Sequence, residues 1–157
     1  MTNKLKQTLK FNPHFHKITL LLISALCYLQ CVEAQVSYQL EYLPQSSKYQ
    51  VSLVSAVTYS GAAQITSTAQ VTLKAPTGTL DIYAFTTLND AEWSPNSQYI
   101  APAESPDYDY FSFGLKSMGT RAISYRAGET ITLFTFANAE GCTGEIQLLD
   151  SRDAFLP

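Results

Sequence analysis

Hydrophobic and polar residues alternate along three segments of the chain that begin at residue 36. In 36–42 the even positions are apolar or aromatic and the odd positions are polar, and a similar period of two recurs in 49–57 and 69–74. A period of two is typical of a β-strand with one buried and one exposed face. These segments predict half-exposed strands of an antiparallel sheet.

Three later segments, 79–85, 111–115 and 130–136, carry apolar residues on both faces. This pattern predicts strands in the middle of a sheet or beneath a loop. Turn residues separate the segments: Pro44, Ser60, Gly61, Pro76, Gly78, Gly119 and Gly128. Seven or eight short strands with no strong helical period predict an all-β fold, namely a two-sheet antiparallel β-sandwich.

The segment 89–109 interrupts this rhythm. It reads NDAEWSPNSQYIAPAESPDYD, and Pro95, Pro102 and Pro106 are expected to prevent a regular central strand. A connection of this length is unusual in a compact domain and is often functional. We therefore expect a long loop here that carries the functional residues.

The N-terminus has the layout of a secretory signal. Four lysines precede the apolar run 18–29, and Val32 and Ala34 supply small residues before a cleavage point. This predicts a cleavable signal helix over residues 1–34, removed before Gln35, followed by a single β-sandwich domain over residues 35–157. The protein is then expected to be secreted, extracellular or attached to the cell surface.

Two alternatives for this N-terminal segment are less favourable. A lipoprotein signal needs a small residue before its cysteine, whereas Leu26 precedes Cys27 and Gln30 precedes Cys31. A membrane anchor needs roughly 18 apolar residues, and the run 18–29 is shorter. We expect no membrane span in the mature chain.

Charge and histidine content exclude several function classes. Residues 35–157 contain six basic and twelve acidic residues, a formal net charge of −6, which disfavours nucleic acid and anionic membranes as partners. Both histidines, His14 and His16, lie in the signal segment. The mature chain thus lacks the usual general base of nucleophilic catalysis and the usual zinc or copper ligand.

Acidic residues in or beside 89–109 offer two weaker possibilities. Oxygen ligands at Glu104, Asp107 and Asp109 could bind calcium, the one cofactor that the sequence leaves open. A hydrolase could use Glu92 or Glu104 together with Asp107 as paired carboxylates. The simplest interpretation is that these are solvated loop acids.

Aromatic residues gather along the same segment. Trp93, Tyr99, Tyr108 and Tyr110 could stack on sugar rings or anchor a partner protein, and we take them as candidate ligand-binding residues. For Trp93 the alternative is a core residue that closes one end of the sandwich.

The order of the segments VSYQLEY, YQVSLVS, AQVTLKAP, YDYFSFGL and ITLFTFANAEGCTGEIQLLD, with DAF after them, resembles a secreted β-sandwich module. Such modules occur in exported and cell-surface proteins of Bacteroidota and cyanobacteria and are similar to cohesin and cadherin-type domains. The resemblance implies an immunoglobulin/cohesin-like sandwich with no catalytic motif.

Cys142 lies between Gly141 and Gly144 and is the single cysteine of residues 35–157. An unpaired thiol persists best in an oxidising compartment when it is buried. The resemblance implies that this structural turn joins the last two core strands, with glycines that allow tight or left-handed backbone and the thiol of Cys142 pointing inward.

Together these observations predict a non-enzymatic extracellular or surface-associated interaction and adhesion module. Its expected partners are an extracellular protein or a polysaccharide, and the alternative function is a carbohydrate-binding module that uses the loop aromatics. Hydrolysis by the paired carboxylates is the third possibility.

Overall fold

The computed structural model describes residues 35–88, 91–116, 123–142 and 144–155, which all lie in one compact unit, Ala34–Pro157. The predicted signal helix and its cleavage point before Gln35 fall at residues 1–34, outside the described residues. The elements are β1 (Val36–Leu43), β2 (Lys48–Ser55), the 3₁₀ turn η1 (Gly61–Gln64), β3 (Gln70–Pro76), β4 (Ile82–Thr87), β5 (Trp93–Ile100), β6 (Tyr108–Leu115), β7 (Thr130–Asn138) and β8 (Gln147–Leu148).

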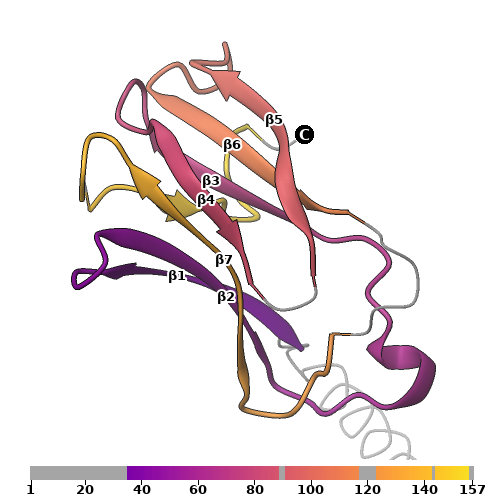
Figure 1. The fold of residues 1–157 in the computed structure, drawn as a ribbon. Helices are drawn as coiled ribbons and strands as arrows, with labels where there is room; N and C mark the ends of the chain where they lie inside the picture. Colours follow the sequence, from indigo (N-terminus) through magenta and orange to yellow (C-terminus); the bar gives the residue numbers. More distant parts are fainter. Residues whose placement is uncertain (1–34, 89–90, 117–122, 143, 156–157) are drawn as a thin grey trace, which may run out of the picture. The chain divides into compact units, whose positions relative to one another are not determined.

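Two four-stranded sheets make up the fold (Figure 1). The first sheet has the order β1–β2–β7–β4 and the second has the order β5–β6–β3–β8, and the strand pairs are antiparallel. This confirms the all-β, two-sheet prediction. The order differs from the seven-stranded immunoglobulin constant domain, in which strand 2 pairs with strand 5 rather than strand 7.

The core lies between the two sheets because the alternating residues of β2 and β3 turn their apolar side chains toward each other. Aromatic rings from both sheets meet there: Phe134 of β7 lies 5.0 Å from Phe113 of β6 and 5.6 Å from Trp93 of β5, measured between ring centroids. Phe85 of β4 stacks on Phe113 at 5.3 Å. The period of two in the sequence therefore translates directly into one shared core.

Segment 89–109 is not the long irregular loop that its prolines predicted. Residues 93–100 form β5, a strand at the edge of the second sheet. An edge strand tolerates proline because one side of its backbone needs no ladder partner. The register also shifts between Pro95 and Ser97, so a bulge accommodates the ring. Among the described residues of this segment, 91–92 and the connection 101–107 from β5 to β6 lie outside strands.

Of the three segments that are apolar on both faces, those of β6 and β7 occupy central positions, whereas β4 lies at the edge of the first sheet. The register of β4 against β7 shifts between Tyr83 and Thr86, and Ala84 has a left-handed φ of 48°. This irregularity breaks the alternation, so the sequence resembled a central strand although Tyr83 is more than half exposed.

The glycine turn is confirmed, but the expected burial of its thiol is wrong. Gly141 and Gly144 have φ values of 78° and 67°, and the turn lies between β7 and β8. The side chain of Cys142 is exposed. The interior position beside the turn is filled instead by the carboxamide of Asn138, whose Nδ2 donates to the carbonyl of Gly141 at 3.2 Å.

Candidate functional site

Trp93 is a core residue, so its prediction as a ligand-binding residue is wrong and the alternative of a core plug is confirmed. Its side chain is buried at 2% exposure and packs on Phe134. Trp93 pairs with Leu115 at the end of β6, on the side of the sheet that faces the core. Its indole Nε1 is buried and has no hydrogen-bond partner within the described residues.

The three tyrosines of the candidate set share the opposite side of the second sheet, here called the outer face. The register pairs Tyr99 and Lys74 with Tyr110, and alternate residues of β3 point into the core. Residues of the outer face include Gln70, Thr72, Lys74, Ser94, Asn96, Tyr99, Tyr108, Tyr110, Ser112 and Gly114. The hydroxyls of Thr72 and Ser112 lie 2.9 Å apart, as expected for neighbours on one face.

Exposure divides these tyrosines. Tyr99 and Tyr108 are 51% and 37% exposed, and they are diagonal neighbours on adjacent strands, close enough for one partner to contact both. Tyr110 is fully buried although it lies on the outer face. Its prediction as an accessible binding residue is wrong for the chain as folded.

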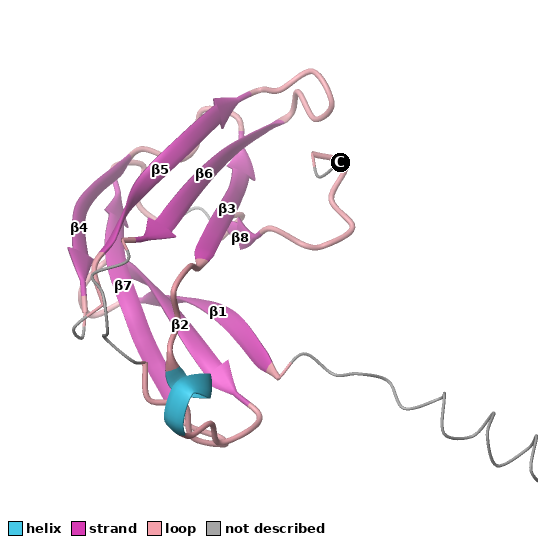
Figure 2. Ribbon diagram, turned by 90° about the vertical axis from the view of Figure 1, so that its right-hand side faces the viewer, coloured by secondary structure: helices cyan, strands magenta, loops and turns pink. Residues whose placement is uncertain are grey.

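Tyr110 is buried because side chains of the C-terminal segment, the chain after β8 in Figure 2, pack on it. The ring of Phe155 stacks on that of Tyr110 at 4.1 Å with an interplanar angle of 15° and lies 5.2 Å from Tyr99. The hydroxyl of Tyr110 bonds to Oδ1 of Asp153 and to Oγ of Ser105, both at 2.8 Å. Two side chains of the segment thus cover a tyrosine of the sheet.

Lys74 completes this cluster. Its Nζ donates to Oδ2 of Asp153, and it lies 4.0 Å from the ring centroid of Tyr108 in a cation–π arrangement. The side chains of Lys74 and Asp153 are 20% and 6% exposed, so this ion pair is shielded from water more than a typical surface pair. In the sequence Lys74 is only the last residue of the alternating segment 69–74, and its partner lies 79 positions away.

Titration of Asp153 should control how firmly the C-terminal segment is held. Burial raises the pKa of this carboxyl, but hydrogen bonds from Lys74, the Phe155 amide and Tyr110, together with the Lys74 charge, leave the pKa below its ordinary value. The hydrogen bond to Asp153 raises the pKa of Lys74. Tyr108, whose ring faces Lys74, contributes in the same direction.

We expect the stabilising effect of Asp153 to be complete above the ordinary pKa of aspartate, about 4, and to be lost as pH falls through its lower folded-state value. At the alkaline end it is lost as pH rises through the raised pKa of Lys74. The check is the difference in free energy of unfolding between wild type and Asp153→Asn. It should be constant from about pH 5 to 9 and shrink in acid; a difference that grew in acid would contradict this assignment.

The acidic residues do not form the predicted group of calcium ligands, and the structure separates one of the two predicted carboxylate pairs. Within the described residues no group of three or more potential ligands could hold a metal ion, so the calcium site at Glu104, Asp107 and Asp109 is wrong. Glu104 and Asp107 are exposed, whereas Asp109 is buried. Glu92 lies at the other end of the β5–β6 hairpin and pairs with Lys116 at 3.0 Å, so it is not brought together with Asp107.

Asp109 has a structural role. Its Oδ1 accepts from the amide of Ala101 at 3.0 Å and its Oδ2 accepts from the amide of Gly78 at 2.8 Å. Both carboxylate oxygens are therefore engaged with backbone donors from two different loops. This explains why an acidic residue is buried at this end of the sheet, since an unpaired buried carboxylate would be costly.

We expect Asp109→Asn to lower the free energy of unfolding by about 2 kcal/mol, because an amide offers one acceptor oxygen and leaves a buried N–H without a partner. Urea unfolding measures this loss. The matched control is Asp107→Asn, an exposed change two residues away that should stay within about 0.5 kcal/mol. Equal losses in the two variants would show that the two hydrogen bonds of Asp109 do not stabilise the loops.

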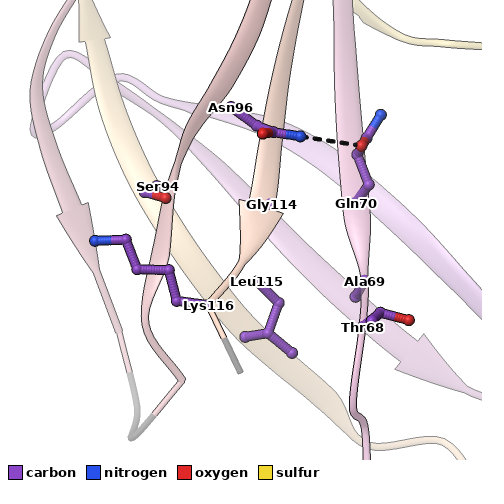
Figure 3. A pocket seen from close by; sticks show the side chains of 8 residues that line it. All are labelled: Thr68, Ala69, Gln70, Ser94, Asn96, Gly114, Leu115 and Lys116. Atoms are coloured by element: carbon purple, nitrogen blue, oxygen red, sulfur yellow. Dashed lines mark hydrogen bonds between the residues drawn. The ribbon is translucent and has the colours of Figure 1, made fainter. Parts of the chain in front are cut away.

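A polar hollow of about 530 Å³ lies on the outer face at the end of the β5–β6 hairpin where Trp93 pairs with Leu115, away from the tyrosines (Figure 3). Its lining residues are Thr68, Ala69, Gln70, Ser94, Asn96, Gly114, Leu115 and Lys116. The Asn96 side chain donates to Oε1 of Gln70 at 3.4 Å, which spans β5 and β3 above the strand that holds Gly114. Amide and hydroxyl groups of this kind can both donate and accept hydrogen bonds.

Gly114 is not required by the backbone or by packing. Its φ is not left-handed, and an added Cβ would meet Asn96 side-chain atoms at 3.6–3.7 Å, an ordinary contact. A glycine inside a strand costs stability and often marks a place where a ligand or another backbone approaches closely. Sequence reasoning missed this hollow because Gln70, Asn96 and Gly114 come from three different strands.

No family model, no curated protein and no solved structure matches this chain. The described part of the chain contains no helix of sufficient length and apolarity to cross a membrane. Inferences about function therefore rest on the geometry of the outer face.

Proposed function

We propose that residues 35–157 are a non-enzymatic interaction and adhesion module that acts outside the cell or at its surface, after removal of a signal peptide. The module recognises its partner with the outer face of the second sheet. The observation that carries this proposal is one face that combines two exposed tyrosines with a polar hollow at a strand glycine. Exposed tyrosines are typical anchors of protein interfaces.

The finer classification as a cohesin-like or cadherin-like sandwich is part of the same proposal and rests on the sequence resemblance. Two four-stranded antiparallel sheets are compatible with it, while the pairing of β2 with β7 separates the chain from the immunoglobulin constant arrangement. Fold alone does not supply function, so the proposal depends on the properties of the outer face.

The test compares three forms of residues 35–157 displayed on cells or beads, scored by capture of extracellular protein and by attachment to surfaces. The outer-face form carries Tyr99→Ala and Asn96→Ala, and the control form carries Gln39→Ala and Glu41→Ala on exposed positions of β1 in the other sheet. We expect the outer-face form to lose capture at least tenfold and the control form to keep it. Equal capture by all three folded forms would overturn the assignment.

Carbohydrate binding is the second candidate, and the hollow around Gly114 favours it. Gln70 and Asn96 offer amides and Ser94 and Thr68 offer hydroxyls, groups that suit the hydroxyls of a sugar. The tyrosines favour it less, because the ring of Tyr99 contacts Phe155 and Lys74 lies over that of Tyr108. A polysaccharide and glycan panel with wild type and Asn96→Ala distinguishes the two functions.

The substitution Gly114→Ala should weaken binding without reducing stability, whether the ligand is a protein or a carbohydrate. We expect the free energy of unfolding to stay unchanged or rise by about 0.5–1 kcal/mol, because the strand loses a glycine and the added methyl has room. Binding through the hollow should weaken, because the methyl fills its floor. Thermal unfolding and the capture assay measure the two quantities on one preparation, and a clear loss of stability would show that the strand needs glycine.

A further inference from the structure

The C-terminal segment occupies a pocket on the outer face through two side chains. The pocket, here called the tail pocket, is formed by Lys74, Tyr99, Ser105, Tyr108 and Tyr110. Asp153 and Phe155 fill it with an ion pair, a hydrogen bond from the Tyr110 hydroxyl at 2.8 Å and the ring stack at 4.1 Å.

The tail pocket recognises two chemical groups at a fixed spacing. The carboxylate of Asp153 uses one oxygen for Lys74 and the other for Tyr110, so both oxygens have specific donors. The ring of Phe155, two residues later, lies against Tyr110 and Tyr99. The amide of Phe155 donates to Oδ1 of Asp153 at 3.0 Å, which holds the carboxylate and the ring on the same side.

The segment is joined to the sandwich by a stretch with exposed side chains. Leu149 is anchored where its amide donates to the carbonyl of Thr72 at 2.9 Å. Beyond it, Asp150 and Arg152 are exposed and bond to each other. Release of the segment after residue 149 therefore breaks the tail-pocket contacts and leaves the pairing of β8 with β3 in place.

We propose that the tail pocket is a recognition site for a partner peptide that carries a carboxylate and, two residues later, an aromatic ring, in competition with the chain's own Asp153 and Phe155. This rests on the proposed function, since it names the partner chemistry of the same outer face. The local charge at Lys74 supports it: this cation lies 4.0 Å and 5.9 Å from the ring centroids of Tyr108 and Tyr110 and pairs with a carboxylate in the folded chain.

The chain's own C-terminal segment competes for the tail pocket, so a partner peptide binds only when it displaces this segment. A tethered ligand acts at an effective concentration on the order of millimolar, so a partner with weaker affinity does not displace it. The released form exposes Tyr110 and leaves Lys74 without its carboxylate. Partner binding and release of the segment are thus one equilibrium.

The experiment titrates a synthetic peptide with blocked ends, Leu-Asp-Ser-Arg-Asp-Ala-Phe, which reproduces residues 149–155. The receptors are wild-type residues 35–157 and the double variant Asp153→Ala, Phe155→Ala, whose pocket is empty. We expect saturable binding to the double variant and at least tenfold weaker binding to wild type, measured by fluorescence anisotropy.

Matched peptides identify the groups that are recognised. Peptides with Asp153→Asn or Phe155→Ala should bind at least about tenfold more weakly, since each loses a charge-assisted bond or a stacked ring. The control peptide with Arg152→Ala should bind within about twofold, because this side chain is exposed in the docked segment. Adding Lys74→Met to the double variant should weaken binding of the unmodified peptide about tenfold.

Three outcomes would overturn the proposal: no saturable binding to a folded double variant, equal binding to wild type, or concentration-dependent dimers that exchange the segment, which would make a second copy the occupant. If the double variant does not fold, excess peptide should accelerate amide exchange at Phe155 in wild type, and unchanged exchange overturns the proposal. If the peptide experiment fails but the Tyr99→Ala, Asn96→Ala form still loses capture, only the tail-pocket proposal is overturned and the proposed function stands.

Discussion

Replacement of Phe134 by alanine should lower the free energy of unfolding by about 3–5 kcal/mol, the largest loss that we expect from a single substitution in this protein. The Phe134 side chain has no solvent exposure, and its ring lies 5.1 Å from Phe85, 5.6 Å from Trp93 and 5.0 Å from Phe113. Truncation leaves a cavity between rings that belong to both sheets. Urea unfolding followed by tryptophan fluorescence measures the loss, because Trp93 reports on the same cluster.

The control for this substitution is Tyr83→Ala, an aromatic truncation at a residue that is 55% exposed on β4. Its effect should remain below about 1 kcal/mol because surface changes are usually small. Phe134→Leu should fall between the two, since most of the volume is retained. If the two alanine variants lost the same stability, the cluster around Phe134 would not be what holds the sheets together.

Asn138→Ala should lower the free energy of unfolding by about 3 kcal/mol, because one buried side chain satisfies three backbone groups. Its Oδ1 accepts from the amide of Asp81 at 2.8 Å, and its Nδ2 donates to the carbonyls of Thr79 at 2.9 Å and Gly141 at 3.2 Å. Alanine leaves these groups buried without partners. Amide exchange at Asp81 should accelerate together with the loss of stability.

An asparagine on the surface provides the comparison. Asn96 makes one long hydrogen bond to Gln70 at an exposed position, so Asn96→Ala should change stability by no more than about 0.5 kcal/mol. Unchanged protection of the Asp81 amide in Asn138→Ala would contradict the role of Asn138 in joining the β3–β4 connection to the turn after β7.

The sequence pattern predicts the role of Phe134 but does not predict the role of Asn138. Phe134 lies in a segment that is apolar on both faces, and this pattern correctly predicted a central strand. Asn138 ends the same strand and has nothing in its local sequence that distinguishes it from a solvated turn residue. Its partners near residue 80 come close only when β4 pairs with β7.

The candidate site shows the same division. The alternation in β5 and β6 would place Tyr99, Tyr108 and Tyr110 on one side of a hairpin. The prolines of 89–109 instead led to the prediction of a loop where β5 lies. The bulge at Pro95 resolves this conflict and could not be located from sequence, because it depends on β5 lying at an edge. The exposure of Cys142 was missed for a related reason, since Asn138 fills the interior position beside it.

The sequence by itself determined the all-β class, the main strands and most of the core, because a period of two depends on local geometry and several strands carry it along their own length. Only the tertiary structure decided which tyrosines face water, that Asp109 holds two loops rather than a metal, and that Asp153 and Phe155 cover Tyr110. The hydrogen bonds of Asp109 join residues that lie 8 and 31 positions apart, and the bond of Tyr110 to Asp153 joins residues 43 positions apart. Their chemistry arises from the order of strands in the sheets, which no single segment encodes.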